Sequence, residues 1–345
     1  MRWLSDETVR HLKRVAEWPD LGETKYRPLE ELGRGGMSTV YLAEDTVLGR
    51  KVALKVVSTA AARPEFVERM RAEARVIARL EHPGIVPVHD AGMLPDGRVF
   101  YAMKRVDGKR LDELAPAMAL PERLRAFQRI CEAVAFAHAH GVVHRDLKPE
   151  NVMIGPFGEV LVMDWGVAKV LADGAGESSV SPTRAPSASS TAAGTIVGTL
   201  AYMAPEQAEG STDRVGTPAD IYALGAILHF LLTGRAPFDA VATERRARGE
   251  ARLAPAPPRR IDPDAPRPLE AIVLRAMAAE PQERYAAASD VAAEVARFLD
   301  GERVVSHREG LFERAERYFS RYRTPILLVL AYLVARTILF FFARG

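Results

Sequence analysis

The stretch that decides the fold is His144-Arg145-Asp146-Leu147-Lys148-Pro149-Glu150-Asn151. Pro149 and the preceding Gly141 predict a loop here. The loop carries a carboxylate, then an ammonium group, then a side-chain amide. An Asp can accept or orient a hydroxyl proton, a Lys can neutralise a phosphate, and an Asn oxygen can ligate Mg²⁺. This set of groups is suited to phosphoryl transfer.

A second carboxylate follows further along the chain. The apolar run Val160-Leu161-Val162-Met163 predicts a strand, and Asp164-Trp165-Gly166 comes directly after it. A carboxylate at the end of an apolar strand is well placed to bind a hard cation. Taken singly, each of these groups is ordinary surface polarity. Their order and spacing favour a catalytic site.

Upstream, a glycine-rich turn, Gly33-Arg34-Gly35-Gly36-Met37-Ser38-Thr39-Val40, lies between two strand-like segments. Glycines let backbone N–H groups approach phosphate oxygens that a side chain would obstruct. The alternative is a plain hairpin turn. The turn is not a Walker loop, because no Gly-Lys-Ser/Thr follows, and it does not open a helix as a Rossmann motif would.

Two charged residues fall where apolar residues are expected. Lys55 lies inside the strand-like run Val52–Val57, and Glu73 lies on the apolar face of the helix predicted from Pro64 to about Leu80. An unpaired carboxylate on such a face would be costly, which favours an ion pair between Glu73 and Lys55. The alternative is that Glu73 lies at the edge of the apolar stripe and reaches water.

Three further motifs stand downstream: Gly198-Thr199-Leu200-Ala201-Tyr202-Met203-Ala204-Pro205-Glu206, then Asp220-Ile221-Tyr222-Ala223-Leu224-Gly225, then Arg284. With them the chain resembles the bacterial eukaryotic-type (Hanks-type) Ser/Thr protein kinases, from about Tyr26 to about Leu299. The resemblance implies an α+β, two-lobed protein kinase fold within residues 26–300. A small β-rich N-lobe would cover about 26–106, and a larger helical C-lobe about 107–300. Residues 1–25 precede the match; their own sequence predicts a helical extension, with Ser5 to Trp18 as a short amphipathic helix and Ser5 as its cap.

The resemblance implies a role for each matching catalytic position. Asp146 would be the catalytic base and Lys148 would contact the γ-phosphate. Lys55, positioned by Glu73, would hold the α- and β-phosphates of ATP. The metal, Mg²⁺ or alternatively Mn²⁺, would be held by Asn151 and Asp164.

The remaining implied roles concern nucleotide contacts and structure. Glu206 would pair with Arg284, and Asp220 would brace the catalytic loop. Lys104 and Val106 would offer backbone groups to the adenine. The implied ATP-binding positions are Leu32, Gly33, Arg34, Gly35, Gly36, Met37, Ser38, Thr39, Val40, Ala53, Lys55, Lys104 and Val106.

The chain departs from the family pattern at three places. Ser38 replaces the third glycine, and Trp165 replaces the usual Phe after the metal-binding Asp. The first change also occurs in bacterial members, and the second alters packing without altering the ligand. Lys104-Arg105 stands where many relatives carry an acidic residue first. This changes the electrostatics of the hinge, whereas the adenine contacts are main-chain.

The activation segment, residues 164–206, contains a low-complexity insertion at 174–195. Its many Ser and Thr residues predict a loop that the enzyme phosphorylates itself, ordered through Arg145 beside the catalytic Asp. The alternative is a tolerated disordered insertion without a regulatory part.

Residues 301–324 form a basic segment, and 325–343 are predicted to form a transmembrane helix. The 18 residues Ile326–Ala343 are interrupted only by Arg336 and Thr337, and their helical rise of about 27 Å is close to the roughly 30 Å of a bilayer core. Upstream arginines and tyrosines favour a single-pass protein whose kinase domain is cytoplasmic. Arg336 argues against a span, because an arginine at the centre of the bilayer costs about 2.5–3.5 kcal/mol of insertion free energy. The alternatives are an interfacial helix, a helix that forms a homodimer, and a cytoplasmic protein.

The whole composition fits a globular enzyme. The 345 residues include 47 Lys and Arg against 45 Asp and Glu, a net charge of +2, which gives no reason to expect nucleic acid as a partner. One cysteine, Cys131, excludes an intrachain disulfide framework and a cysteine-based zinc site. We therefore expect a protein kinase that uses ATP to phosphorylate Ser and Thr of protein substrates. The alternative is a pseudokinase scaffold that binds nucleotide without catalysis.

Overall fold

The computed structural model describes residues 18–34, 38–57, 75, 77–165, 169–170, 200–209, 215–248, 250, 252–310, 314 and 323–342. The helix predicted at Ser5–Trp18, most of the helix predicted at Pro64–Leu80 and the insertion at 174–195 lie outside these residues. The same holds for Gly35, Gly36, Met37 and Glu73.

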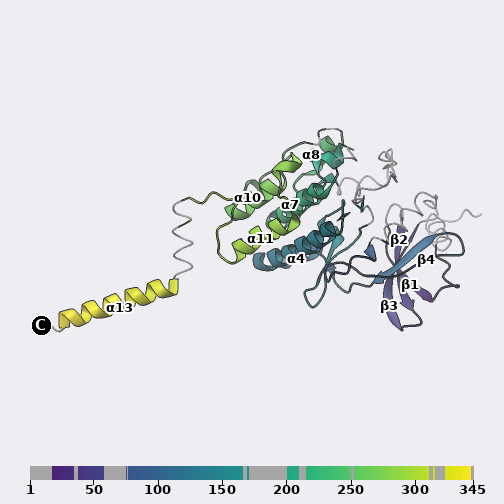
Figure 1. The fold of residues 1–345 in the computed structure, drawn as a ribbon, viewed down its shortest axis with the longest axis horizontal. Helices are drawn as coiled ribbons and strands as arrows, with labels where there is room; N and C mark the ends of the chain where they lie inside the picture. Colours follow the sequence, from purple (N-terminus) through teal and green to yellow (C-terminus); the bar gives the residue numbers. More distant parts are fainter. Residues whose placement is uncertain are drawn as a thin grey trace, which may run out of the picture.

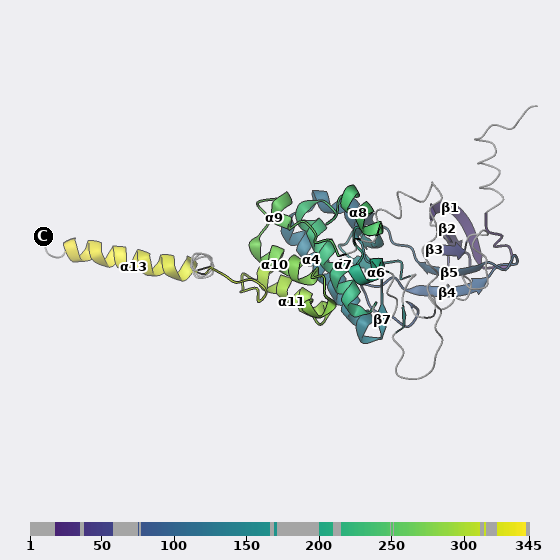
Figure 2. The ribbon, with the colours of Figure 1, turned by 90° about the horizontal axis from the view of Figure 1, so that it is seen from above.

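The chain folds into two lobes of different composition (Figures 1 and 2). The N-lobe is an antiparallel sheet with strand order β1-β2-β3-β5-β4. Its strands are β1 (Tyr26–Arg34), β2 (Ser38–Asp45), β3 (Arg50–Val57), β4 (Val88–Met93) and β5 (Val99–Lys104).

Alternation along β3 separates a core face from a cleft face. Val52, Leu54 and Val56 are buried in the N-lobe core together with Leu21, Tyr26 and Phe100. Because successive strand residues point to opposite sides, Ala53 and Lys55 lie on the other face. A lysine inside an apolar strand is thereby directed away from the core of its own lobe.

The C-lobe is mainly helical and carries short strands next to the cleft. The helices are α3 (Leu111–Leu114), α4 (Leu120–Ala139), α6 (Pro205–Ala208), α7 (Thr217–Thr233), α8 (Ala240–Ala247), α9 (Pro258–Ile261), α10 (Arg267–Ala276) and α11 (Ala288–Leu299). The strands are β6 (Lys109–Arg110), β7 (Val142–Val143), β8 (Val152–Ile154), β9 (Val160–Val162) and β10 (Lys169–Val170), with 3-10 turns at Ala115–Ala117, Pro149–Asn151 and Pro281–Glu283.

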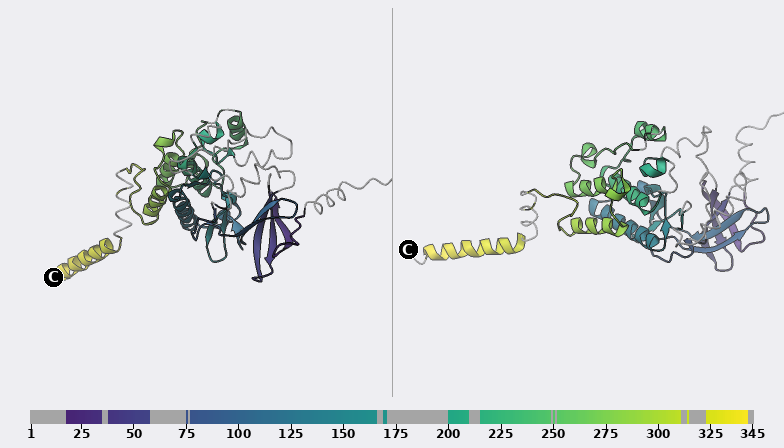
Figure 3. Two further views of the ribbon diagram at one scale, coloured as in Figure 1. Left: turned by 45° about the vertical axis from the view of Figure 1, so that its right-hand side comes forward. Right: turned by 45° about the horizontal axis from the view of Figure 1, so that its top comes forward.

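Helix α7 is the centre of the C-lobe. It is apolar on nearly all sides and packs against α4, α10 and α11 (Figure 3). A Cβ at Gly225 would lie 2.7 Å from the side chains of Ala276 and Met277, so only glycine permits this close approach of α7 to α10. Gly234 ends the helix with φ +68°, the left-handed conformation that glycine adopts readily.

The C-terminal helix α13 (Arg323–Phe342) lies apart from both lobes (Figure 1). Its described apolar side chains, from Leu327 to Leu339, are exposed. Within the part of the chain that the structure describes, no helix combines the length and the apolar character needed to cross a bilayer. The predicted transmembrane helix is therefore not supported, and the charged Arg336 lies inside α13.

Candidate active site

The catalytic loop lies between β7 and β8 and is anchored to α7. Asp220 is 1% exposed and accepts hydrogen bonds from the backbone N–H groups of His144 and Arg145, each at 2.8 Å. His138 of α4 also donates to Asp220, from Nε2 at 2.8 Å. Arg145 has φ +69°, an uncommon value for a residue other than glycine. Asp220 thus holds a strained turn of the loop in place.

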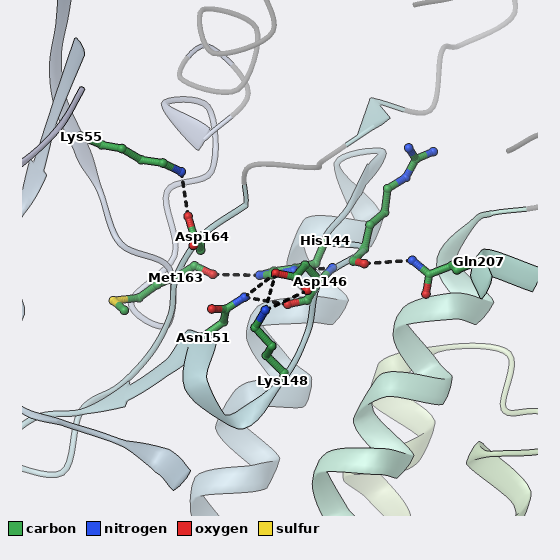
Figure 4. Close-up of polar contacts among 9 residues, drawn as sticks. Lys55, His144, Asp146, Lys148, Asn151, Met163, Asp164 and Gln207 are labelled. Carbon is green, nitrogen blue, oxygen red and sulfur yellow. Dashed lines mark hydrogen bonds and ion pairs between the residues drawn. The ribbon is translucent and has the colours of Figure 1, made fainter. Parts of the chain in front are cut away.

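Three of the residues predicted from the sequence converge at this loop (Figure 4). Nζ of Lys148 lies 3.0 and 3.2 Å from the carboxylate oxygens of Asp146. Nδ2 of Asn151 donates to Oδ2 of Asp146 at 3.0 Å and to its backbone oxygen at 2.8 Å. The carboxylate of Asp146 is therefore fixed in orientation by a cation on one side and an amide on the other.

The imidazole of His144 links this loop to the strand end that carries Asp164. Its Nε2 donates to the carbonyl of Met163 at 2.9 Å, and its Nδ1 accepts from the backbone N–H of Asp146 at 3.2 Å. A ring nitrogen that faces a carbonyl must carry the proton, and one that faces an N–H must not. These two contacts fix one neutral tautomer for His144.

Asp164 and Lys55 form an ion pair across the cleft. Nζ of Lys55, which is 8% exposed, lies 2.7 Å from Oδ1 of Asp164. Desolvation raises the pKa of Asp164, but the charge and hydrogen bond of Lys55 outweigh it, so the pKa lies below its usual value. Asp164 is thus kept ionised, as a metal ligand must be. The predicted pair of Lys55 with Glu73 lies outside the described residues.

Trp165 is packed beneath the catalytic loop. It is 1% exposed, and its ring centroid lies 4.6 Å from that of His144. Its indole Nε1 donates to the carbonyl of Val162 at 3.2 Å, a bond that the usual Phe could not make. Asp164, next to it, has φ +62°. The substitution therefore adds a polar anchor to the strand end that presents Asp164.

The positions expected to bind ATP that the structure describes lie on β1, β2 and β3 of the N-lobe sheet and at its exit. Gly33 and Arg34 of β1 lie opposite Val40 and Thr39 of β2, which brings the two ends of the glycine-rich turn together. Leu32 is on β1 and half exposed, and Ser38 begins β2. The sheet pairs Ala53 on β3 with Met103 on β5.

At the exit from the sheet, the backbone N–H of Lys104 donates to the carbonyl of Pro87 at 3.0 Å. Val106 lies two residues beyond Lys104, and the adenine contacts expected of both residues stay predictions. Arg105 pairs with Asp107 at 2.8 Å, which offsets the positive charge of the hinge locally.

The metal ligands implied by the sequence fit a magnesium ion that is shared with phosphate. In the described residues, no three His, Cys, Asp or Glu side chains gather as a metal site by themselves. Mg²⁺ usually takes one or two protein oxygens and completes its shell with substrate phosphates and water. The ionised Asp164 and the amide oxygen of Asn151 are oxygen donors of this kind.

The pair predicted between the end of the activation segment and the C-lobe is present. Arg284 contacts Glu206 through Nη1–Oε1 at 2.6 Å and Nη2–Oε2 at 2.8 Å, and both residues are buried. Sequence reasoning missed two other contacts of this region. These are His138 with Asp220, and Gln207, whose Nε2 donates to the carbonyl of Arg145 at 2.9 Å. Gln207 follows Glu206 directly, which is the one sequence signal that could have found it.

A family model described as the protein kinase domain matches residues 26–295. The chain belongs to the protein kinase domain family. This match confirms the two-lobed fold, and the relatives described next confirm the resemblance to bacterial Ser/Thr protein kinases that the motifs around Asp146 predict.

Curated relatives of this kinase domain carry matching names. The serine/threonine-protein kinase PknB of Mycolicibacterium smegmatis is 40% identical over 285 residues, covering 81% of this chain and 43% of the relative. PrkC of Bacillus subtilis, also named a serine/threonine-protein kinase, is 35% identical over 297 residues, covering 85% and 43%. The chain spans less than half the length of these relatives.

Solved structures agree with the fold. The crystal structure of the Mycobacterium tuberculosis PknI kinase domain superimposes with a TM-score of 0.60 at 28% identity, covering 81% of this chain and 96% of that one. The likeness thus covers nearly the whole of a solved kinase domain.

Proposed function

We propose that this protein is a serine/threonine protein kinase, which transfers the γ-phosphoryl group of ATP to Ser and Thr hydroxyls of proteins. The observation that carries the proposal is the cluster of Asp146, Lys148 and Asn151 together with the Lys55–Asp164 pair that bridges the cleft. The names of the relatives at 35–40% identity support the same reaction.

In this proposal the acceptor hydroxyl approaches the carboxylate of Asp146. The hydroxyl oxygen forms a bond to the γ-phosphorus while the bond from that phosphorus to the β–γ bridging oxygen breaks, and ADP leaves. Asp146 orients the hydroxyl and takes its proton. Asn151 and Lys148 hold the carboxylate toward the acceptor, as their contacts at 3.0 Å indicate.

The two lysines supply positive charge at different places. Lys148 stands beside Asp146, where it can neutralise the transferring phosphoryl group without leaving its hydrogen bonds. Lys55 would leave Asp164 for the α- and β-phosphates of ATP, which frees that carboxylate for a cation. When bound, Mg²⁺ held by Asn151 and Asp164 would offset the charge of the phosphates.

The alternative is a pseudokinase scaffold. The presence of two contacting pairs, Lys55 with Asp164 and Asn151 with Asp146, does not favour it. We further propose that the enzyme phosphorylates its own activation segment, because Arg145 precedes the catalytic Asp and the insertion at 174–195 is rich in hydroxyls.

The test is incubation of the purified full chain with radiolabelled ATP and Mg²⁺, followed by mapping of labelled residues by mass spectrometry. Asp146→Asn is the control, because it keeps the size of the side chain and removes the base. We expect label on Ser or Thr in the wild type only. Nucleotide binding without label in the wild type would instead favour the scaffold.

The location of the protein is a separate proposal. We propose a cytoplasmic kinase domain, with membrane attachment through the basic segment and α13, whose described apolar side chains are exposed. The alternative is that the apolar side chains of α13 are covered by a second copy of the chain in a homodimer. Fractionation of cells that express the full chain or residues 1–310 tests this. Equal recovery of both in the soluble fraction would contradict attachment.

A further inference from the structure

Gln207 uses both ends of its side-chain amide to join two parts of the active site. Its Oε1 accepts a hydrogen bond from the backbone N–H of Ala204 at 3.2 Å. Its Nε2 donates to the backbone carbonyl of Arg145 at 2.9 Å (Figure 4). One partner is a donor and the other an acceptor, so only one orientation of the amide satisfies both. The first bond caps α6, and the second reaches the catalytic loop.

The carbonyl that Gln207 binds belongs to the peptide group between Arg145 and Asp146. The N–H of this same group donates to Nδ1 of His144 at 3.2 Å. The peptide group is therefore held at its oxygen by α6 and at its nitrogen by His144. Because Asp146 begins at this nitrogen, a rotation of the peptide group would turn the carboxylate that is proposed to accept the proton.

The backbone at this point needs such support. Arg145 has φ +69°, and its N–H donates to Asp220 of α7 at 2.8 Å. A residue other than glycine keeps this conformation only where its surroundings enforce it. Asp220 secures the peptide group before Arg145, and Gln207 secures the one after it.

Helix α6 is itself held to the C-lobe by buried contacts. Glu206, the neighbour of Gln207, forms the buried ion pair with Arg284. The carbonyl of Met203, just before the helix, accepts from Nη2 of the buried Arg246 at 2.5 Å. A displacement of α6 would break these contacts, so Gln207 is carried by an element that is fixed to the C-lobe on two sides.

We infer that Gln207 is a positioning residue for phosphoryl transfer, which couples the C-terminal end of the activation segment to the orientation of Asp146. The inference rests on the proposed kinase function. Gln207 touches neither nucleotide nor acceptor in this role. Its effect is expected on the rate of the chemical step rather than on the affinity for ATP.

Two variants of the full chain separate the two bonds of Gln207. Gln207→Glu keeps an oxygen for the N–H of Ala204, as in the usual capping box, but sets a carboxylate against the carbonyl of Arg145. Gln207→Lys keeps a donor for Arg145 but loses the acceptor that caps α6. Gln282→Glu, at an exposed position away from the cleft, is the matched control for added charge.

The readouts are kcat and KM for ATP, measured by ADP release with casein as acceptor, together with Tm. For Gln207→Glu we expect a fall in kcat of about tenfold or more, with KM within about twofold and Tm unchanged. For Gln207→Lys we expect a lower Tm with kcat largely kept. Gln282→Glu should match the wild type in all three.

Two results would overturn the inference. One is a wild-type kcat in Gln207→Glu. The other is a loss of kcat that follows Tm in both variants, as a purely structural role would give. Failure of the proposed kinase function looks different, because the wild type and the control would then also release no ADP, and the inference would fall with it.

Discussion

Replacing Glu206 by alanine should leave the guanidinium of Arg284 buried without its carboxylate. Among the described residues, Arg284 makes five hydrogen bonds, two to Glu206 and one each to the carbonyls of Ala278, Pro218 and Ala279. Its exposure is 4%, and that of Glu206 is 5%. Water therefore cannot replace the lost partner without a change in the packing of the C-lobe.

The expected cost follows from these contacts. Removing one partner of a buried ion pair costs about 3–5 kcal/mol, because an uncompensated charge stays buried. Arg284 keeps its three carbonyls, and its guanidinium lies 5.0 Å from the ring of Tyr222. We therefore expect the lower end, about 3 kcal/mol, which is roughly a 150-fold change in the unfolding equilibrium.

The assay is equilibrium unfolding in urea, followed by circular dichroism, on the wild type, Glu206→Ala, Arg284→Met and the double variant Glu206→Leu/Arg284→Met. The double variant removes both charges and fills the space, so it should be more stable than Glu206→Ala. A Glu206→Ala variant within about 0.5 kcal/mol of the wild type would refute this explanation, and so would a double variant no more stable than Glu206→Ala.

Three other variants probe the cleft and the C-terminal segment. Lys55→Met should abolish phosphoryl transfer, which ATP turnover checks. It should change the unfolding free energy by less than about 1 kcal/mol, because the side chain of its partner Asp164 is 53% exposed; urea unfolding checks this. Trp165→Phe should lower the free energy of unfolding by about 1–3 kcal/mol, because the hydrogen bond to Val162 is lost and the ring is smaller. It should retain activity, because Phe is the usual residue there. An unchanged Tm in a thermal denaturation assay would contradict the expected loss of stability. Burial of Glu294 raises its pKa, but its hydrogen bonds from Ser306, Val305 and Arg297 bring the pKa below the usual value. The stabilisation from ionised Glu294 is then present above about pH 4.5 and is lost as the pH falls through the lowered pKa. The difference in unfolding free energy between the wild type and Glu294→Gln should therefore shrink on acidification. A constant difference from pH 7 to pH 3 would contradict this expectation.

The strands and helices with a clear pattern of apolar residues were predictable from the sequence. The strand around Lys55 is predicted by its alternation of apolar residues, and the strand before Asp164 by its apolar run. The buried helix at the centre of the C-lobe is predictable because its sequence is almost entirely apolar and Gly234 follows it. The fixed order of the motifs around Asp146 identifies the family, because so many matching pieces in one order exceed chance.

The contacts that join distant parts could not be predicted in this way. Gln207 meets Arg145 across 62 residues of sequence, and His138 meets Asp220 across 82. No periodicity reports such pairs, since they depend on how whole helices are packed. The backbone bond from Lys104 to Pro87 is likewise independent of side-chain type. The hydropathy of 325–343 predicted a helix there, and α13 is one, but the predicted span is not supported.

The segment before β1 has a consequence for where this kinase domain begins. Leu21 is buried in the N-lobe core, and the ring of Trp18 stands edge-on to that of Tyr41 in β2 at 5.1 Å. The backbone carbonyl of Trp18 accepts from Arg98 in the turn between β4 and β5, at 3.4 Å. The segment therefore ties together strands that are not neighbours in the sheet. A recombinant fragment that starts at Tyr26, where the family match starts, would lose these contacts, so the packed N-lobe begins before the family match.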